Sequence, residues 1–247
     1  MSEPGGAARM TEPLPDNITP FIRVMAFAER TALRCLTRVR IDGPIGRIPK
    51  DGPLIIASNH LSNADGVLVG GWLTPALGRR IHWLGKREFL EWPIVGRMAQ
   101  AGSVHPVDRG TADLEAYRLA ERILAEGHVL VVFPEGTRSP TGALQEAKDG
   151  LAMLALRSGA PILPVAITGT DRFWPKGRLF RLGGRIGLNV GEAFRVADIL
   201  PSTVDRKTAK RLATPAIMGR IAELLPSRYR GAYGMAAGRP APGEVPS

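Results

Sequence analysis

The sequence of 247 residues predicts an α/β protein with a mostly parallel central sheet, helices on both faces and a basic amphipathic helix in front of it. Two observations support this fold. Short apolar runs rich in β-branched residues, such as 129–133, alternate with longer segments of helical periodicity, which is typical of strand–helix–strand units. These runs are also apolar at consecutive positions, as expected of strands that are buried on both faces.

The first 38 residues divide into two parts. Residues 1–17 are rich in Gly, Pro and Ala without periodicity, which predicts a disordered lead-in. Residues 18–38 repeat apolar side chains at three- and four-residue spacing, while the four arginines of this segment lie mainly off that stripe. The pattern predicts the amphipathic helix, and it leaves open whether this helix packs on the domain or docks on a membrane surface.

Residues 39–225 are expected to form one domain. In its first half, apolar runs predict strands at residues 39–41, 54–58, 81–84 and 104–107. Between these, helices are expected at residues 66–77, where the pair Gly70 and Gly71 indicates close packing, and at residues 88–98, with Pro93 near the start.

In the second half, helices are expected at residues 111–126, 147–158 and 205–225, and strands at 129–133, 162–167 and 185–190. Thr111 is a candidate N-cap and Gly127 a C-terminal stop, because a hydroxyl can satisfy first-turn N–H groups and glycine adopts the left-handed conformation. Residues 226–247 return to Gly, Pro and Ala, which predicts a disordered tail.

The most informative loop follows the strand at residues 54–58. It places His60 and Asp65 five positions apart, and such residues would not meet on one continuous helix. If the chain turns after His60 and a helix starts near Asp65, the carboxylate can accept a hydrogen bond from one imidazole nitrogen and leave the other as a base. Taken alone, the pair could equally be a surface or capping feature.

A second polar loop, residues 134–139, comes directly after the strand at 129–133. It combines Glu135, the turn glycine Gly136, the hydroxyl of Thr137 and the guanidinium of Arg138, which can grip a phosphate. Ligands of parallel sheets bind beyond the carboxyl ends of the strands, so both loops are candidate ligand-binding loops.

Charge and missing motifs limit the function. Lys and Arg number 33 against 23 Asp and Glu, a formal charge of +10, which favours anionic partners such as lipid, nucleotide phosphates or an acidic protein. Aromatic residues are only 6% and are not interleaved with the basic positions, which argues against nucleic acid. Walker and Gly-x-Ser-x-Gly motifs are absent, and no His or Cys spacing suggests a metal site, so His82, His105 and His128 are interpreted as structural or surface residues.

Taken together, several segments resemble the ordered blocks of the glycerolipid acyltransferases, and most closely the bacterial 1-acyl-sn-glycerol-3-phosphate acyltransferases. These segments are 59–65, 85–86, 107–109, 133–139 and 163–167, and the likeness spans about residues 39–193. One departure is visible, because the family usually has a glycine six residues before the arginine that corresponds to Arg109. Here that position is Ser103.

The resemblance implies transfer of a fatty acyl group from acyl-CoA or acyl carrier protein to the sn-2 hydroxyl of lysophosphatidic acid, without a cofactor or metal. It implies His60 as general base and Asp65 as its orienting carboxylate. It also implies that the acceptor phosphate is bound by residues of the other blocks: Lys86, Arg109, Glu135, Gly136, Thr137 and Arg138.

The same resemblance predicts a peripheral enzyme on the cytoplasmic side of the cell membrane, since the longest uncharged runs, for example residues 66–78, are too short to span a bilayer. Two alternatives remain open at this point. The acceptor could be another lysolipid or alcohol, or the chain could be a basic lipid-binding module without activity.

Overall fold

The computed structural model describes residues 13–91, 93–107, 113–175, 177–200 and 205–234. Its strands are β1 Arg38–Asp42, β2 Leu54–Ser58, β3 Ile81–Lys86, β4 Val104–Val107, β5 Val129–Val132, β6 Ile162–Thr168 and β7 Arg185–Val190. Its helices are α1 Pro20–Leu36, α2 Ala64–Leu77, α3 Arg87–Leu90, α4 Pro93–Ala101, α5 Asp113–Ala125, α6 Gly150–Ser158, α7 Thr170–Phe173, α8 Val196–Ile199 and α9 Arg206–Glu223. Short 3-10 helices cover Ile45–Arg47, Ser227–Tyr229 and Gly231–Tyr233.

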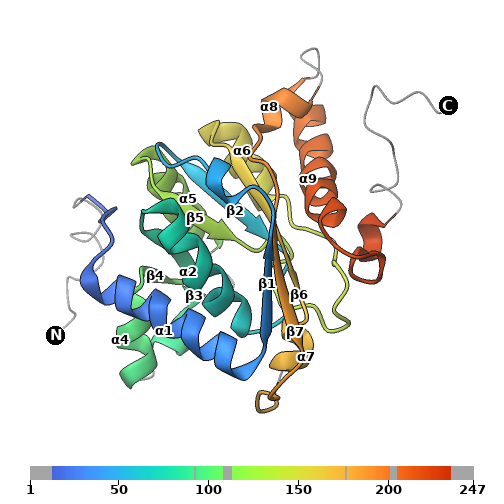
Figure 1. The fold of residues 1–247 in the computed structure, drawn as a ribbon. Coiled ribbons are helices and arrows are strands. Elements are labelled where there is room, and N and C mark those ends of the chain that lie inside the picture. Colours follow the sequence, from blue (N-terminus) through green and yellow to red (C-terminus); the bar gives the residue numbers. More distant parts are fainter. Residues whose placement is uncertain (1–12, 92, 108–112, 176, 201–204, 235–247) are drawn as a thin grey trace.

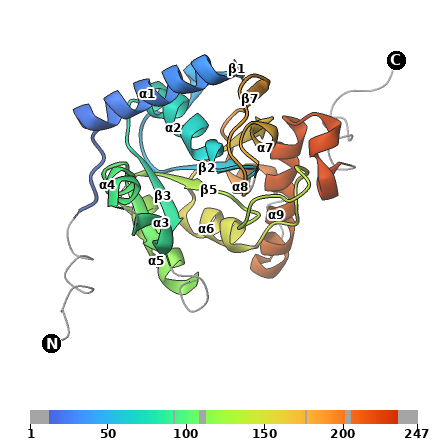
Figure 2. The ribbon, with the colours of Figure 1, turned by 90° about the horizontal axis from the view of Figure 1, so that it is seen from below.

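The seven strands form one sheet in the order β1-β7-β6-β2-β5-β3-β4. Strands β2 to β6 are parallel to one another, whereas β7 pairs with β6 in the antiparallel direction and β1 runs parallel to β7. Helices α1 and α2 cover one face, and α5, α6 and α9 cover the other (Figures 1 and 2). The predicted fold class is confirmed.

The central strands supply the core. All five residues of β2 are buried, and β5 and β6 are buried along most of their length, as the continuous apolar runs predict. Helix α1 packs mainly on α2, where a Cβ atom on Gly71 would lie 3.3 Å from Glu29 and Arg30 side-chain atoms. The pair Gly70 and Gly71 of α2 therefore allows close packing of helices, as expected from the sequence.

The segment predicted as one helix at residues 88–98 forms two helices, α3 and α4. The second begins at Pro93, because proline has no N–H to continue the preceding helix but fits the first helical turn. The N-cap expected at Thr111 lies outside the described residues.

Order extends beyond both predicted boundaries of the domain. Asp16 accepts hydrogen bonds from the Arg79 guanidinium and, through its carbonyl, from the Arg80 N–H at 3.0 Å. At the other end, Tyr229 is buried and its carbonyl accepts the Leu144 N–H at 2.8 Å. Tyr233 adds a second contact, since its hydroxyl accepts the Ala147 N–H at 3.1 Å, so residues 226–234 are ordered although their composition led us to expect disorder.

Candidate active site

The two polar loops singled out in the sequence meet at one edge of the sheet. His60 follows β2 and residues 134–139 follow β5, and these strands are parallel neighbours. The loops are joined directly, because the Ser139 N–H donates to the His60 carbonyl at 2.8 Å. This edge, at the carboxyl ends of β2 to β6, is called the site edge below.

The Asp65 carboxylate organises the first loop. It is fully buried in the first turn of α2, and one of its oxygens, Oδ2, accepts from the N–H groups of Leu61 at 2.6 Å and Ser62 at 2.8 Å. The same oxygen lies 2.8 Å from His60 Nδ1. The N-terminal helix dipole and these N–H groups complement the negative charge of the carboxylate.

The His60 ring is held in one orientation with one nitrogen committed. Since Asp65 is a carboxylate that acts as acceptor, Nδ1 carries the proton of the hydrogen bond, and the neutral ring then has its lone pair on Nε2. The ring stacks on Phe133, with centroids 4.2 Å apart, and its side chain keeps 22% of its surface exposed. His60 is therefore placed to act as a base at the surface of the site edge.

Glu135 fastens the two loops together. Its Oε1 accepts from the His60 N–H at 2.9 Å, and its Oε2 accepts from the N–H of Gln145 at 3.0 Å and from the Gln145 side chain at 3.1 Å. Burial raises the pKa of Glu135 above its ordinary value, although these donors and the His60 ring oppose the rise. The sequence suggested that Glu135 contacts substrate, whereas in the structure both of its oxygens are directed at the protein.

Arg138 is the cation nearest to the first loop in this turn. It is half-buried, and its Nη1 donates to Asn63 Oδ1 at 3.0 Å, so the guanidinium lies beside the residue that precedes α2. Gly136 is exposed with φ of 69°, and a Cβ there would lie 3.2 Å from Lys148 Cε. Lys148 is thus a second cation at this turn, and the sequence did not single it out. Thr137, the residue after Gly136, is exposed.

Two further residues were predicted to bind the acceptor phosphate, Lys86 and Arg109. Lys86 is exposed at the carboxyl end of β3, on the site edge, and is separated from β2 by β5. Arg109 lies outside the described residues. The structure therefore brings together His60, Asp65 and Arg138, and it puts Lys86 at the same edge.

Thr170 is a site residue that the sequence did not reveal. Its hydroxyl donates to Asp65 Oδ1 at 2.6 Å from 105 positions away, so that both carboxylate oxygens are engaged. The N–H of the preceding Gly169 in turn donates to the Tyr229 hydroxyl at 3.1 Å. A threonine after a strand is too common to be a signal, and only the fold shows this contact.

The other histidines gather at the amino ends of β3, β4 and β5, which are called the opposite edge of the sheet below. His82 Nδ1 lies 2.9 Å from His105 Nε2, and the His82 ring stacks on His128 with centroids 5.2 Å apart. Burial, the two neighbouring histidines and Arg80 lower the pKa of His82 to about 4. Among the described residues there is no group of three or more His, Cys, Asp or Glu side chains arranged to hold a metal ion.

Ser103, which replaces the glycine of the family pattern, belongs to this same edge. Its backbone has φ of 63°, the left-handed conformation that glycine adopts most easily, which is a reason for a glycine at this position in the family pattern. The serine hydroxyl accepts from Arg80 Nη1 at 3.0 Å. This hydrogen bond offsets part of the cost of the strained backbone.

Comparison with protein families and curated proteins points to one chemistry. The model of the acyltransferase family matches residues 39–168. A 1-acyl-sn-glycerol-3-phosphate acyltransferase of Limnanthes alba is 36% identical over 128 residues, which cover 50% of this chain and 43% of that protein. The protein of the same name from Bacillus subtilis is 29% identical over 181 residues, which cover 72% of this chain and 83% of that protein. The chain thus spans less than half the length of the plant relative.

A solved structure shares the fold. The crystal structure of the 1-acyl-sn-glycerophosphate (LPA) acyltransferase PlsC from Thermotoga maritima superposes with a TM-score of 0.63 at 27% sequence identity. The match covers 79% of this chain and 78% of that chain.

Proposed function

We propose, since the chain belongs to the acyltransferase family, that it moves a fatty acyl group from a thioester donor, acyl-CoA or acyl carrier protein, to the sn-2 hydroxyl of lysophosphatidic acid. The observation that carries this proposal is the meeting of the His60–Asp65 pair with Arg138 across two joined loops. A base and a phosphate-binding cation at one edge are what an acceptor with a hydroxyl near a phosphate requires.

The reaction follows from the orientation of the His60 ring. Nε2 accepts the proton of the acceptor hydroxyl as its oxygen attacks the thioester carbonyl, and Asp65 stabilises the imidazolium that results. The tetrahedral intermediate then collapses by breaking the carbon–sulfur bond, and the thiolate takes the proton from His60. The acyl group passes directly to the acceptor oxygen, so no covalent acyl-enzyme forms.

The acceptor phosphate would be bound by the turn after β5. Arg138 and Lys148 supply the charge there, and the exposed Gly136–Thr137 backbone can approach a ligand closely. We propose that Arg109 and Lys86 complete this anion site. Glu135 contributes by holding the turn and His60 in a fixed relation.

We further propose that the site edge faces an anionic membrane surface on its cytoplasmic side. Phe21, Val24 and Phe27 are exposed along α1, and the loop between α7 and β7 exposes a second apolar cluster. The members of this cluster, called the apolar loop below, are Leu179, Phe180 and Leu182.

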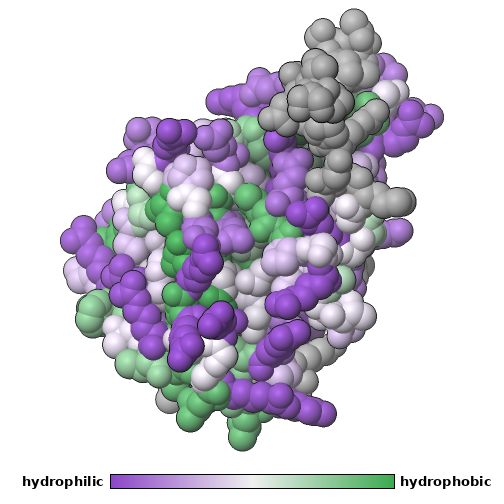
Figure 3. Space-filling view, turned by 45° about the vertical axis from the view of Figure 1, so that its right-hand side comes forward, coloured by the Kyte–Doolittle hydropathy of each residue, from purple (hydrophilic) through white to green (hydrophobic). Residues whose placement is uncertain are grey.

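The apolar loop lies next to the C-terminal end of α1, whereas Phe21, Val24 and Phe27 lie in the first half of that helix. The Gly183 N–H donates to the Leu36 carbonyl at 2.7 Å, which ties the apolar loop to the end of α1. Figure 3 shows apolar surface next to charged side chains at the lower end of the molecule, where α7 lies in Figure 1. Among the described residues no helix is long and apolar enough to cross a bilayer. Mixed apolar and basic surface favours peripheral docking on anionic lipid.

The test is transfer of a labelled acyl group by the purified chain to a panel of lysolipids that differ in headgroup. Lysophosphatidic acid is expected to be the best acceptor, because its phosphate is a terminal dianion, whereas other lysophospholipids carry a phosphodiester. Better transfer to another lysolipid or alcohol would contradict this acceptor. Transfer to no acceptor by the folded protein would contradict the enzyme.

A further inference from the structure

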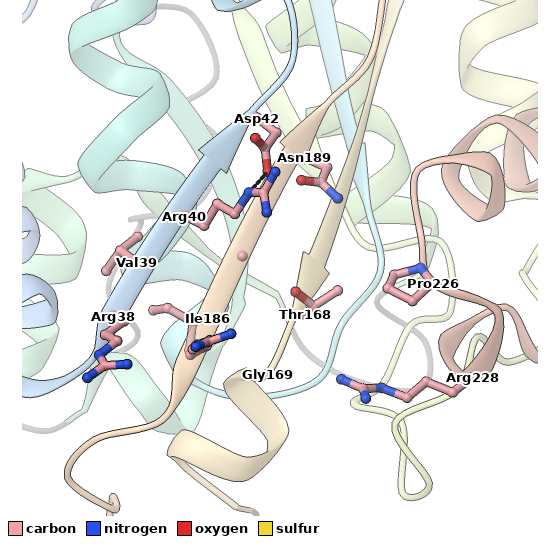
Figure 4. A pocket seen from close by; sticks show the side chains of 12 residues that line it. Arg38, Val39, Arg40, Asp42, Thr168, Gly169, Ile186, Asn189, Pro226 and Arg228 are labelled. Atoms are coloured by element: carbon pink, nitrogen blue, oxygen red, sulfur yellow. Dashed lines mark ion pairs between the residues drawn. The ribbon is translucent and has the colours of Figure 1, made fainter.

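A groove of about 580 Å³ lies on the sheet face that carries α9 (Figure 4). Its floor is formed by β1 and β7, and its far wall by the turn after α9. The residues that line it are Arg38, Val39, Arg40, Asp42, Thr168, Gly169, Arg185, Ile186, Gly187, Asn189, Pro226 and Arg228. Its volume is in the range usual for small-molecule sites.

The groove is strongly basic. Four of its lining residues are arginines, and they come from three separate parts of the chain. The carboxylate of Asp42 also lines it and forms an ion pair with Arg40 at 2.6 Å. Arg228 reaches from the turn toward Gly169 with its guanidinium 4.8 Å from the Tyr229 ring centroid. An excess of guanidinium groups in a concave surface attracts ligands with several phosphates.

The groove is directed from the site edge into water. Arg38 and Arg185 are register partners at that edge, because β1 and β7 begin where β6 ends. Arg40 and Asn189 lie further along the strands, away from the edge. Gly169, at the lower end of the groove, directly precedes Thr170, whose hydroxyl donates to Asp65.

We infer that this groove binds the phosphorylated nucleotide of acyl-CoA, with its diphosphate and 3′-phosphate on the arginines. The inference rests on the proposed function, because it assigns a site to the donor of that reaction. The acyl chain and the water-soluble half of the donor must leave the thioester in opposite directions, toward lipid and toward water. The groove supplies the second direction. It begins at Gly169, next to Thr170, whose hydroxyl donates to Asp65.

The shape of the groove favours this occupant over an acidic protein. A carrier protein docks through a broad surface of several hundred Å² on each partner. Here the arginines surround a cavity of small-molecule size instead. The donor's nucleotide carries three phosphate groups, which matches the several guanidinium groups that face the cavity.

The experiment compares acyl-CoA with S-acyl-pantetheine, a donor that has the same thioester and no phosphates. In the double variant Arg185→Ala/Arg228→Ala, KM for acyl-CoA is expected to rise about 10- to 100-fold, as for lost hydrogen bonds between charged groups. KM for S-acyl-pantetheine and kcat with either donor are expected to stay within about twofold. Arg211→Ala, an exposed arginine on α9 outside the groove, is the matched control and should behave as the parent.

A binding measurement separates this inference from the proposed function. Adenosine 3′,5′-bisphosphate should bind the full chain in equilibrium dialysis and should bind the double variant at least tenfold more weakly, whether or not any acceptor is acylated. Unchanged binding in the double variant would overturn the inference. So would a loss of activity that is equal for both donors, or one seen only with acyl carrier protein. A defect confined to binding of anionic vesicles would equally overturn it.

Discussion

The two edges of the sheet use the same residue type in opposite ways. At the site edge, His60 is half-exposed, donates to a buried carboxylate and keeps Nε2 directed away from that partner. At the opposite edge, His82 and His128 are buried, His105 is half-buried, and they pack on one another with arginines nearby. Imidazole itself is common to both edges, so the difference in function must come from what surrounds it.

The comparison identifies what the proposed general base needs. At His60 a buried carboxylate accepts the ring N–H through Oδ2 and is itself held by Thr170 through Oδ1, whereas burial, the neighbouring histidines and Arg80 lower the pKa of His82. A histidine of the second kind can fill space and pair with its neighbours, but it cannot gain a proton near neutral pH. The predictions below either remove this contrast or make it larger.

The largest effect is expected at the catalytic ring. His60→Ala should lower kcat by about 10²- to 10⁴-fold, because the acceptor hydroxyl loses its base. His82→Gln should leave kcat within about threefold, although it can lower the melting temperature. Steady-state transfer assays and thermal melts of both variants check this. Equal loss of activity in the two variants would remove the distinction between the edges.

The next effect concerns binding of the site edge to a membrane surface. The triple variant Leu179→Ser/Phe180→Ser/Leu182→Ser should bind vesicles containing anionic lipid at least tenfold more weakly, since even partial burial of three apolar side chains contributes more than about 1.4 kcal/mol. Cosedimentation with vesicles measures this. Replacing the exposed Leu212 of α9 by Ser is the control and should change nothing. Undiminished binding of the triple variant would mean that the apolar loop does not meet the bilayer.

A smaller effect is expected from the hydrogen bond that Thr170 donates to Asp65. Thr170→Val removes the hydroxyl that donates to Asp65 Oδ1 and should lower kcat about tenfold, in line with one lost hydrogen bond to a charged group. Thr170→Ser keeps the hydroxyl and should retain most of the activity. The pH profile of kcat adds a second measurement: in the valine variant its acidic limb should shift, because the carboxylate that stabilises the imidazolium is altered. An unshifted profile with normal kcat would exclude this role.

The smallest effect is a pH dependence that belongs to the opposite edge alone. Burial and the neighbouring histidines hold the pKa of His82 at about 4 in the folded chain, below the ordinary value of 6.5. The unfolded chain therefore binds a proton that the folded chain does not, and stability falls as pH decreases from about 6.5 to about 4. The slope from this group is at most about 1.4 kcal/mol per pH unit. Denaturant unfolding at several pH values should show a shallower slope in His82→Gln, and an identical slope would refute the assignment.

Much of the fold and the centre of the site were accessible from the sequence. Strands such as β2 and β5 are continuous apolar runs, and their pattern depends only on neighbouring residues. The contact of His60 with Asp65 was also predictable, since the residues are five positions apart across a single turn. Local signals thus located both polar loops.

The parts that escaped prediction depend on contacts between distant segments. Thr170 reaches Asp65 only because β6 lies beside β2, and His82 meets His105 only through the register of β3 with β4. Likewise, the composition after Pro226 gives no sign that Tyr229 is buried and that residues 226–234 are ordered. Each of these contacts depends on how distant segments pack together, which no single segment encodes.

The position of Glu135 also constrains how this site can change over evolutionary time. Because one carboxylate is shared by the backbone of His60 and by Gln145, a substitution there would misplace His60 and the turn at residues 134–139 together. Adaptation to a new headgroup is therefore confined to neighbours such as Thr137 that point outward. The proposed acceptor preference can therefore change by substitution of such neighbours, while the contacts of Glu135 with His60 and Gln145 stay the same.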